Sequence, residues 1–271
     1  MKRPVSINLV PLLGVLVAIG CGSGRSESAP VGEQHSEAAP AKQLAQADPE
    51  QAHASATSGG ATIQGSVKFT GPTPSSERVK MDADPQCQLQ HKEPVTKQDV
   101  VVNANGTLQH VFVYVKEGLQ GQTFPAPEQP AVLDQQGCMY HPHVLGVRVN
   151  QPLQIVNSDS TLHNVNCKPT KSKPFNIAQP TKGMKSTKQF TAPEVMVKCA
   201  CNVHPWMANY IGVLDHPFFS VTNDQGVFSI SGLPAGQYTI EAWHEKFGAK
   251  TQQVTVGQGE ARDVSFEFSG Q

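Results

Sequence analysis

The chain has 271 residues, of which 38% are hydrophobic and 16% are charged, and its formal net charge is −1 at pH 7. A nearly neutral chain without a basic run lacks the electrostatic signature of a protein that binds nucleic acids. The part beyond residue 60 is long enough for one large β domain or two small ones.

The N-terminus has the pattern of an export signal. Basic residues at positions 2 and 3 precede an apolar run from Leu9 to Ile19, which is shorter than the ~20 apolar residues that a membrane-spanning helix needs. The ending Ala18-Ile19-Gly20-Cys21 resembles the bacterial lipobox, although alanine replaces the usual leucine. We expect residues 1–21 to be a lipoprotein signal peptide with Cys21 acylated; a soluble protein cleaved nearby is the alternative. Gly22 favours the outer membrane, by analogy with enteric bacteria.

Residues 22–60 are predicted to be a disordered tether. They contain no aromatic residue, and Val31 and Leu44 are their only larger aliphatic residues. Such a segment buries too little surface to offset its chain entropy. As a flexible coil it would reach about 35 Å.

Beyond residue 60, short apolar runs repeat at period two and are separated by Gly, Pro, Asn and Asp clusters, which is typical of a β-sandwich. Within each run the alternating side chains share one face of a strand. The runs are Ile63, Val67 and Phe69; Val111, Val113 and Val115; Leu153 and Ile155; and Val195, Val197, Cys199 and Cys201.

Two motifs carry candidate metal ligands. In LQIVNSDSTLHNVNC, residues 153–167, a strand ends at Asn157, a polar turn follows, and His163 comes out of this turn just before a second extended piece. In CACNVHPWM, residues 199–207, two cysteines, a histidine and a methionine lie within nine positions. Two imidazoles, one thiolate and a weak thioether are the ligands of blue copper, whereas zinc rarely takes methionine. Taken singly, these side chains would be ordinary strand, core or loop residues; taken together, they indicate a copper site.

The joint pattern resembles the plastocyanin and amicyanin branch of the cupredoxins over residues 98–214. The matching motifs are Asn-x-Asp-x3-His-Asn (Asn157, Asp159, His163, Asn164) and Cys-x2-His-Pro-x-Met (Cys201, His204, Pro205, Met207). The short spacing before the methionine is closest to amicyanin. The resemblance implies an antiparallel Greek-key sandwich that holds one type 1 copper ion near one end.

The same resemblance assigns a role to each candidate. His163 and His204 would be the imidazole ligands. Cys201 would supply the thiolate and Met207 the axial thioether. Asn164 would join the two ligand loops by hydrogen bonds behind the cysteine.

A binuclear purple copper site, also found on cupredoxins, competes for the same residue types. It uses two bridging cysteines that are normally separated by three residues. Here a single residue separates Cys199 from Cys201, which disfavours this alternative.

Six cysteines occur in a chain predicted to be exported, where disulfides persist. If one is acylated and one binds copper, four remain. Cys167 follows the first ligand histidine by four residues, and Cys199 precedes the ligand cysteine by two, so each shares a strand face with a ligand. This favours a bond between Cys167 and Cys199 and leaves Cys87 with Cys138. Free buried thiols are the alternative.

Four of the eight histidines outside the ligand motifs lie in stretches that could hold a second metal. His143 alternates with Leu145 in a strand-like run, which favours a structural, hydrogen-bonded role, and the stretch around His244 is typical of a strand end. The sequence leaves open whether His141, His143, His216 or His244 binds a second metal.

From His216 onward the motifs are those of tight turns. Asn223–Gly226 predicts a turn between two alternating strands, and Leu233–Tyr238 predicts a second corner. Both resemble the carboxypeptidase regulatory-like, transthyretin-like module, which implies a small β-sandwich over residues 215–271. Turn motifs inform about fold and not function, and no catalytic constellation accompanies them.

The boundary between the two domains has two solutions. We expect the cupredoxin domain to span residues 61–214, because consecutive elements are usually neighbours in space. However, Gly65-Ser66-Val67 and Gly71-Pro72 resemble the opening strand of a regulatory-like module. In that alternative residues 61–72 belong to the C-terminal module, and the cupredoxin is inserted into it.

The sequence therefore predicts an all-β periplasmic protein, anchored to a membrane by lipid, that binds one copper ion and passes single electrons to or from a redox protein such as a c-type cytochrome. The four ligands leave no open coordination position, which favours a carrier over an enzyme. One alternative is a copper storage or delivery protein. Another is a binding or adhesion module with a vestigial copper site.

Overall fold

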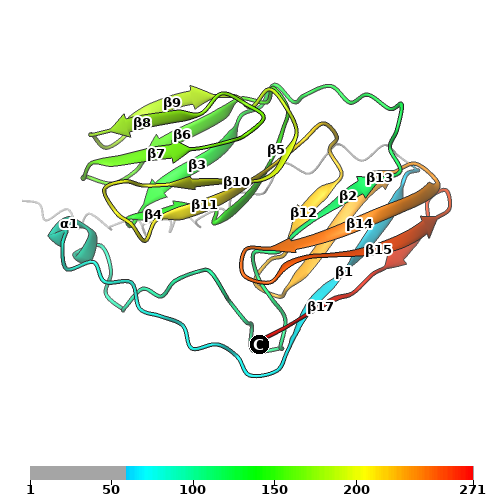
Figure 1. Cartoon of the computed structure of the whole chain (residues 1–271), viewed down its shortest axis with the longest axis horizontal. Coiled ribbons are helices and arrows are strands. Elements are labelled where there is room, and N and C mark those ends of the chain that lie inside the picture. Colours follow the sequence, from blue (N-terminus) through cyan, green and yellow to red (C-terminus); the bar gives the residue numbers. More distant parts are fainter. Residues whose placement is uncertain (1–58, 271) are drawn as a thin grey trace, which may run out of the picture. The chain divides into compact units, whose positions relative to one another are not determined.

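The computed structural model describes residues 59–270, and the predicted signal peptide, Cys21 and nearly all of the predicted tether lie outside the described residues. The described part is almost entirely β, with seventeen strands and one short helix (Figure 1). Within it, no helix has the length and apolarity needed to cross a bilayer. The strands form four sheets, which confirms the predicted all-β class.

Two of these sheets share one apolar core and form the cupredoxin-like sandwich. Its centre is made by fully buried aliphatic side chains such as Leu133, Ile155 and Val165. The pairs β11–β5 and β3–β6 are parallel, so the sheets are not purely antiparallel. The first sheet has the order β5-β11-β10-β7-β8 and the second the order β4-β3-β6-β9. The strands are β3 (Ala131–Gln136), β4 (Met139–His141), β5 (Val144–Arg148), β6 (Leu153–Asn157), β7 (His163–Cys167), β8 (Phe175–Gln179), β9 (Lys185–Lys188), β10 (Glu194–Ala200) and β11 (Ala208–Leu214).

The other two sheets form the C-terminal sandwich around a second core. The predicted turn at Asn223–Gly226 joins two of its strands, and Gly226 has a φ of 67°, which suits glycine. One sheet has the order β13-β1-β16 with β17 also paired to β1, and the other the order β12-β2-β14-β15. The strands are β1 (Ala61–Thr70), β2 (Phe112–Glu117), β12 (Phe219–Val221), β13 (Val227–Leu233), β14 (Gly236–His244), β15 (Gly248–Val256), β16 (Ala261–Asp263) and β17 (Phe266–Ser269).

The strand pairing corrects the expected boundary at residue 61. β1 pairs with β13, β16 and β17, which all lie in the C-terminal part. β2 pairs with β12 and β14 of that same part. This is the pairing that the insertion alternative requires, and it extends to β2, which the sequence placed in the cupredoxin range. The physical reason is that an alternating run shows which face is buried but not which strand lies beside it.

A second correction concerns Val195. The sequence placed it on the same face as Val197, but it packs against a third apolar cluster that includes Tyr114, Leu214 and Trp243. The register of β10 against β11 shifts between Glu194 and Val197. Because such an irregularity adds a residue to one strand, it reverses the faces on either side of it.

The segment between β1 and β2 leaves the C-terminal sandwich and contributes to the other one (Figure 1). It carries helix α1 (Pro85–Gln88), which begins after the N-cap Asp84. Cys87 in this helix forms a disulfide with Cys138, next to β4. The insertion therefore starts with a covering segment rather than with a strand.

Candidate metal centre

The sequence-predicted ligands come from two adjacent strands. His163 is the first residue of β7, and Cys201 directly follows β10. These strands pair with Cys167 opposite Cys199, so both ligand segments lie at the same end of the sheet. His204 and Met207 lie on the loop that connects β10 to β11.

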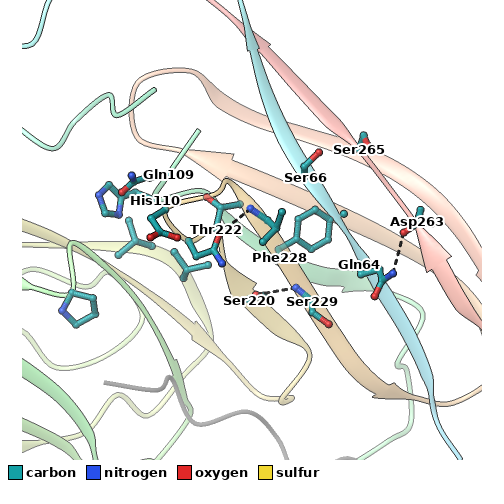
Figure 2. Close-up of a pocket in the computed structure, with 17 residues that line it drawn as sticks. Gln64, Ser66, Gln109, His110, Ser220, Thr222, Phe228, Ser229, Asp263 and Ser265 are labelled. Atoms are coloured by element: carbon teal, nitrogen blue, oxygen red, sulfur yellow. Dashed lines mark hydrogen bonds between the residues drawn. The ribbon is translucent and has the colours of Figure 1, made fainter. Parts of the chain in front are cut away.

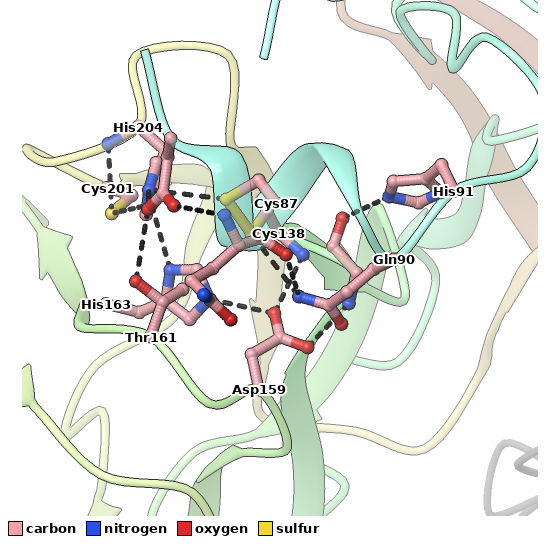
Figure 3. The surroundings of a disulfide bond; sticks show 12 residues. Cys87, Gln90, His91, Cys138, Asp159, Thr161, His163, Cys201 and His204 are labelled. Atoms are coloured by element: carbon pink, nitrogen blue, oxygen red, sulfur yellow. Dashed lines mark hydrogen bonds and ion pairs between the residues drawn. A yellow bond between two sulfur atoms is a disulfide. The ribbon is translucent and has the colours of Figure 1, made fainter. Parts of the chain in front are cut away.

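Three of the four candidates bring their ligand atoms together. His163 Nδ1 lies 3.0 Å from His204 Nδ1, and Cys201 Sγ lies 3.8 Å from His204 Nδ1. The three side chains form a group whose ligand atoms all lie within 4.8 Å of one another. Their exposed fractions are 0%, 4% and 2% for His163, Cys201 and His204, so the polar atoms face each other away from solvent (Figure 3).

The loop that carries Met207 closes back on the cysteine. The Met207 amide donates to the His204 carbonyl at 2.9 Å, and the Cys201 amide donates to the Met207 carbonyl at 3.1 Å. The Met207 side chain is fully buried in the core of the same sandwich. The loop thus fixes the backbone of the three predicted ligands that it carries.

A carboxylate lies beside the Nε2 atom of each histidine. His163 Nε2 lies 2.8 Å from Asp159 Oδ2, and His204 Nε2 lies 3.0 Å from Asp84 Oδ2. Asp159 is itself held by the backbone amides of Gly137 and Cys138. Because a carboxylate accepts the Nε2 proton, it leaves Nδ1 as the ligand atom of each ring. The two Nδ1 atoms are the ones that face each other.

The same contacts set the charge of the cluster. Burial raises the pKa of the Cys201 thiol, but hydrogen bonds from His163 and His204 outweigh it and lower that pKa to about 5. Burial lowers the pKa of His163, but its bonds to Asp159 and Cys201 raise it to about 9. A cysteine binds a metal as the thiolate, so the cluster favours the form of Cys201 that a metal needs.

Asn164 occupies the position expected for a link between the ligand loops. Its Oδ1 atom accepts a hydrogen bond from the Asn202 amide at 2.7 Å and lies 3.4 Å from Cys201 Sγ. Its Nδ2 atom donates to Asn176 Oδ1 at 2.7 Å. One side chain on β7 therefore orients the loop that follows β10.

Both disulfides favoured by the sequence are present. Cys167 is bonded to Cys199 and Cys87 to Cys138, and Cys201 is the free cysteine of the described residues. The alternative of free buried thiols does not hold for these four. With Cys199 engaged in a disulfide, Cys201 is left without the second thiolate that a binuclear purple site requires.

The four histidines that the sequence left open as second metal ligands, His141, His143, His216 and His244, do not gather with other ligands. Among the described residues, the groups of three or more ligand atoms close enough to hold a metal include none of them. His143 contacts the Glu245 carboxylate, while the ring nitrogens of His216 and His244 accept backbone amides. His141 Nε2 lies near the Gln136 carbonyl. These contacts fit structural roles.

The site also contains residues that the sequence analysis missed. Asp84 and Cys87 precede the range of the cupredoxin resemblance, yet Asp84 Oδ2 and Cys87 Sγ lie 3.0 Å and 3.5 Å from His204 Nε2. The Asp84-Pro85 pair is a helix-start signal, which would have identified the short helix. Nothing in the local pattern could have placed that helix over the ligand loop.

A separate groove lies on the C-terminal sandwich. Its volume is about 1050 Å³, and polar side chains on β1, β12, β13 and β16 contribute much of its wall, with Pro142 and Val144 of the other sandwich at its edge (Figure 2). Ser66, Ser229 and Asp263 are among the polar residues, and none of the candidate ligands lines it. The groove offers mainly hydroxyl and amide groups, and no group of three candidate metal ligands among the described residues lies in it.

Comparisons with known proteins match each sandwich separately. The family model of the carboxypeptidase regulatory-like domain matches residues 215–269. The matched part lacks β1 and β2, which complete this sandwich in the structure. No curated protein matches the chain.

The solved structures similar to this chain include copper proteins of the cupredoxin type. A purple cupredoxin from Nitrosopumilus maritimus is 22% identical, with 31% of this chain and 98% of that chain covered and a TM-score of 0.27. The Cu(I) form of a methionine-to-alanine mutant of amicyanin is 20% identical, with 37% and 97% covered and a TM-score of 0.28. The copper-containing nitrite reductase of Thermus scotoductus SA-01 is 23% identical, with 34% of this chain but only 24% of the reductase covered and a TM-score of 0.30.

The described part is therefore an all-β protein of two sandwiches, and the C-terminal one contains the segment that matches the carboxypeptidase regulatory-like model.

Proposed function

We propose that this protein binds one type 1 copper ion through His163, Cys201, His204 and Met207 and serves as a single-electron carrier. The observation that carries the proposal is the convergence of two imidazole Nδ1 atoms and one thiol within 4.8 Å in a buried site. One thiolate and two imidazoles with a nearby thioether fit copper better than zinc, magnesium or calcium.

Copper bound there would supply a one-electron couple, because a thiolate, two imidazoles and a weak fourth ligand suit both Cu(I) and Cu(II). The chain's own residues orient the ligands and exclude water. Asp159 and Asp84 hold the two rings, Asn164 holds the cysteine loop, and the apolar core surrounds them. A buried, fully ligated site disfavours substrate chemistry at the metal, so we propose a carrier rather than an enzyme.

The decisive test is the optical spectrum after Cu(II) is added to the metal-free protein. We expect an intense blue or green colour from charge transfer between Cys201 and the metal, and Cys201→Ser should abolish it. Met207→Leu should keep the colour but shift the redox potential, since the axial ligand tunes it. The exposed Met184 supplies a matched control, Met184→Leu, with wild-type behaviour. A colourless Cu(II) complex of the wild-type protein would refute the proposal.

Electron paramagnetic resonance distinguishes the proposed mononuclear site from the binuclear alternative. One type 1 copper ion should give a four-line hyperfine pattern, whereas a mixed-valence pair gives seven lines. The Cys167–Cys199 disulfide supports the mononuclear site, because it removes the second thiolate.

Two alternative functions can each be distinguished from electron transfer by a measurement. A copper storage or delivery protein would bind copper tightly but would exchange electrons with periplasmic cytochromes slowly in stopped-flow mixing. A binding module with a vestigial copper site would be purified from its native compartment without copper. The polar groove on the C-terminal sandwich is the surface that favours the second alternative.

We further propose that the protein is exported, acylated at Cys21 and anchored to a periplasmic membrane face, with a c-type cytochrome as one suitable partner. The N-terminal pattern is the basis for export, acylation and anchoring, and the cytochrome follows only from the proposed one-electron role. The protein should partition into detergent with the membrane fraction, and Cys21→Ser should release it or leave it unprocessed. An intact mass that shows an unmodified N-terminus at another residue would refute the anchor.

A further inference from the structure

One contact to the candidate copper site comes from outside the strands of the cupredoxin-like sandwich. Asp84 lies in the segment between β1 and β2, more than a hundred residues before His204 in the sequence. Its Oδ2 atom lies 3.0 Å from His204 Nε2. The contact is made through Nε2, whereas Nδ1 of the same ring faces His163 and Cys201, so Asp84 lies on the side of the ring away from these ligands.

Three contacts fix the Asp84 carboxylate. Its Oδ1 atom accepts the Gln86 amide at 2.8 Å as the N-cap of α1, and its Oδ2 atom also accepts the Thr161 hydroxyl at 3.1 Å. Thr161 lies on the turn just before His163. Asp84 therefore joins the covering segment to both ligand loops at once.

The Cys87–Cys138 disulfide pins this segment in place. It links α1 to the residue whose backbone amide donates to Asp159 at 2.7 Å. Cys87 Sγ itself lies 3.5 Å from His204 Nε2 (Figure 3). The disulfide thus connects the two carboxylates that hold the two candidate ligand histidines.

We propose that Asp84 is a positioning residue for His204 and that the α1 segment, pinned by the Cys87–Cys138 disulfide, is a cover that retains copper and favours Cu(II) over Cu(I). The inference rests on the proposed copper site. A carboxylate that accepts the Nε2 proton fixes the ring with Nδ1 toward the metal and makes that nitrogen a stronger donor. A stronger anionic environment stabilises the more highly charged ion, which is Cu(II).

The first test compares substitutions at Asp84 in the full chain. Asp84→Ser keeps an N-cap oxygen for α1 but is too short to reach His204, and Asp84→Asn keeps the cap and removes the charge. The exposed Asp82 gives a matched control, Asp82→Asn. We expect Asp84→Ser to lower Cu(II) affinity at least about 10-fold and to affect Cu(I) less. A 10-fold difference between the two ions raises a one-electron potential by about 59 mV.

The potential separates positioning from a merely structural role. If Asp84 only helped the protein to fold, its loss would weaken the binding of Cu(I) and Cu(II) equally. The redox potential would then equal that of Asp82→Asn, and this result would overturn the proposal. A smaller rise for Asp84→Asn than for Asp84→Ser would support it, since the amide oxygen still accepts a hydrogen bond but carries no charge.

The second test concerns the cover. In the double variant Cys87→Ser/Cys138→Ser the backbone amide of residue 138 remains available to Asp159, but α1 is no longer pinned. We expect copper to pass to a colourless chelator at least about 10-fold faster than from the wild-type protein, with the charge-transfer band retained. An unchanged transfer rate would overturn the proposal that the α1 segment is a cover.

The two proposals fail in different ways. If Cu(II) gives no intense band with the wild-type protein, the copper carrier and this inference both fall. If the band forms in every variant but the potentials and transfer rates match the Asp82→Asn control, the copper site stands and only the role of Asp84 and the cover is refuted.

Discussion

At the scale of single residues, Asn164 is the side chain on which the two ligand loops meet. It accepts the Asn202 amide and lies beside Cys201 Sγ. Neighbours of metal ligands that orient them contribute about 10- to 100-fold in metal affinity, and a buried hydrogen bond contributes about 1 kcal/mol to stability.

We therefore expect Asn164→Ala to lower copper affinity at least about 10-fold and the unfolding free energy of the metal-free protein by about 1–2 kcal/mol. Asn166 lies two residues further along β7 and donates to the exposed Asn202 side chain, so Asn166→Ala is the matched control. Equal copper affinities of the two variants, measured by chelator competition, would contradict this role.

His216 makes the stability of the metal-free protein depend on pH. Burial lowers the pKa of His216 to about 4, with a smaller raising effect of Asp215 and a smaller lowering effect of Arg148, whereas an unfolded histidine titrates near 6.5. Between these two pKa values the unfolded state binds more protons than the folded state. The contribution of neutral His216 to the free energy of unfolding is therefore fully present above pH 6.5 and is lost as the pH falls toward 4. The slope for one such group is at most about 1.4 kcal/mol per pH unit.

The measurement is denaturant unfolding of metal-free wild-type protein and His216→Asn between pH 7 and pH 4.5. We expect the wild-type protein to lose stability faster than the variant as the pH falls, so that the difference between them narrows. The exposed His141 supplies the control, and His141→Asn should follow the wild-type curve. Parallel curves for wild type and His216→Asn would show that this histidine is not buried in its neutral form.

At the scale of elements, β1 and β2 are interior strands of the C-terminal sandwich although they come first in the chain. β1 lies between β13 and β16, and β2 lies between β12 and β14. Their inward side chains, including Ile63, Val67 and Val113, are fully buried. A fragment without them loses the centre of both sheets.

We expect a fragment of residues 215–271 to be unfolded in isolation, although it contains the whole segment that matches the regulatory-like family. The matched comparison is residues 59–271, which retain every described strand and should fold. Circular dichroism and the dispersion of amide NMR signals distinguish the two. A folded 215–271 fragment would mean that β1 and β2 are dispensable additions.

At the scale of the whole described part, the two sandwiches share an apolar cluster. It includes Phe112 from β2 and Leu214 from β11. Gly212 on β11 lies directly against this cluster, because a Cβ atom there would come within 2.4 Å of the Phe112 ring. Glycine at this position permits the close approach of the two β-sheets.

We expect Gly212→Val to cost about 1–3 kcal/mol through overpacking and to split one calorimetric unfolding transition into two, as the sandwiches lose their shared contacts. Gly257→Ala is the control, since a Cβ atom there meets only the flexible Glu260 side chain at 3.3 Å. A single transition in both variants, with equal midpoints, would show that the junction contributes no coupling.

Much of the fold and the candidate site can be predicted from local sequence. The period-two runs mark buried strand faces, and His163 and Cys201 are predicted together because His163 lies at the start of one extended segment and Cys201 at the end of another. The even spacing that puts Cys167 and Cys199 on the faces of these ligands leads to their disulfide. These predictions succeed because spacing along a strand determines which side chains share a face.

Only the tertiary structure decides which segments lie beside each other. It places β1 and β2 in the C-terminal sandwich, turns Val195 to another face at a register shift, and brings Asp84 to the far side of His204. None of these follows from local pattern. A strand can pair with any edge that buries its apolar face, and the choice depends on the apolar surface that the whole chain buries, which no short stretch of sequence contains.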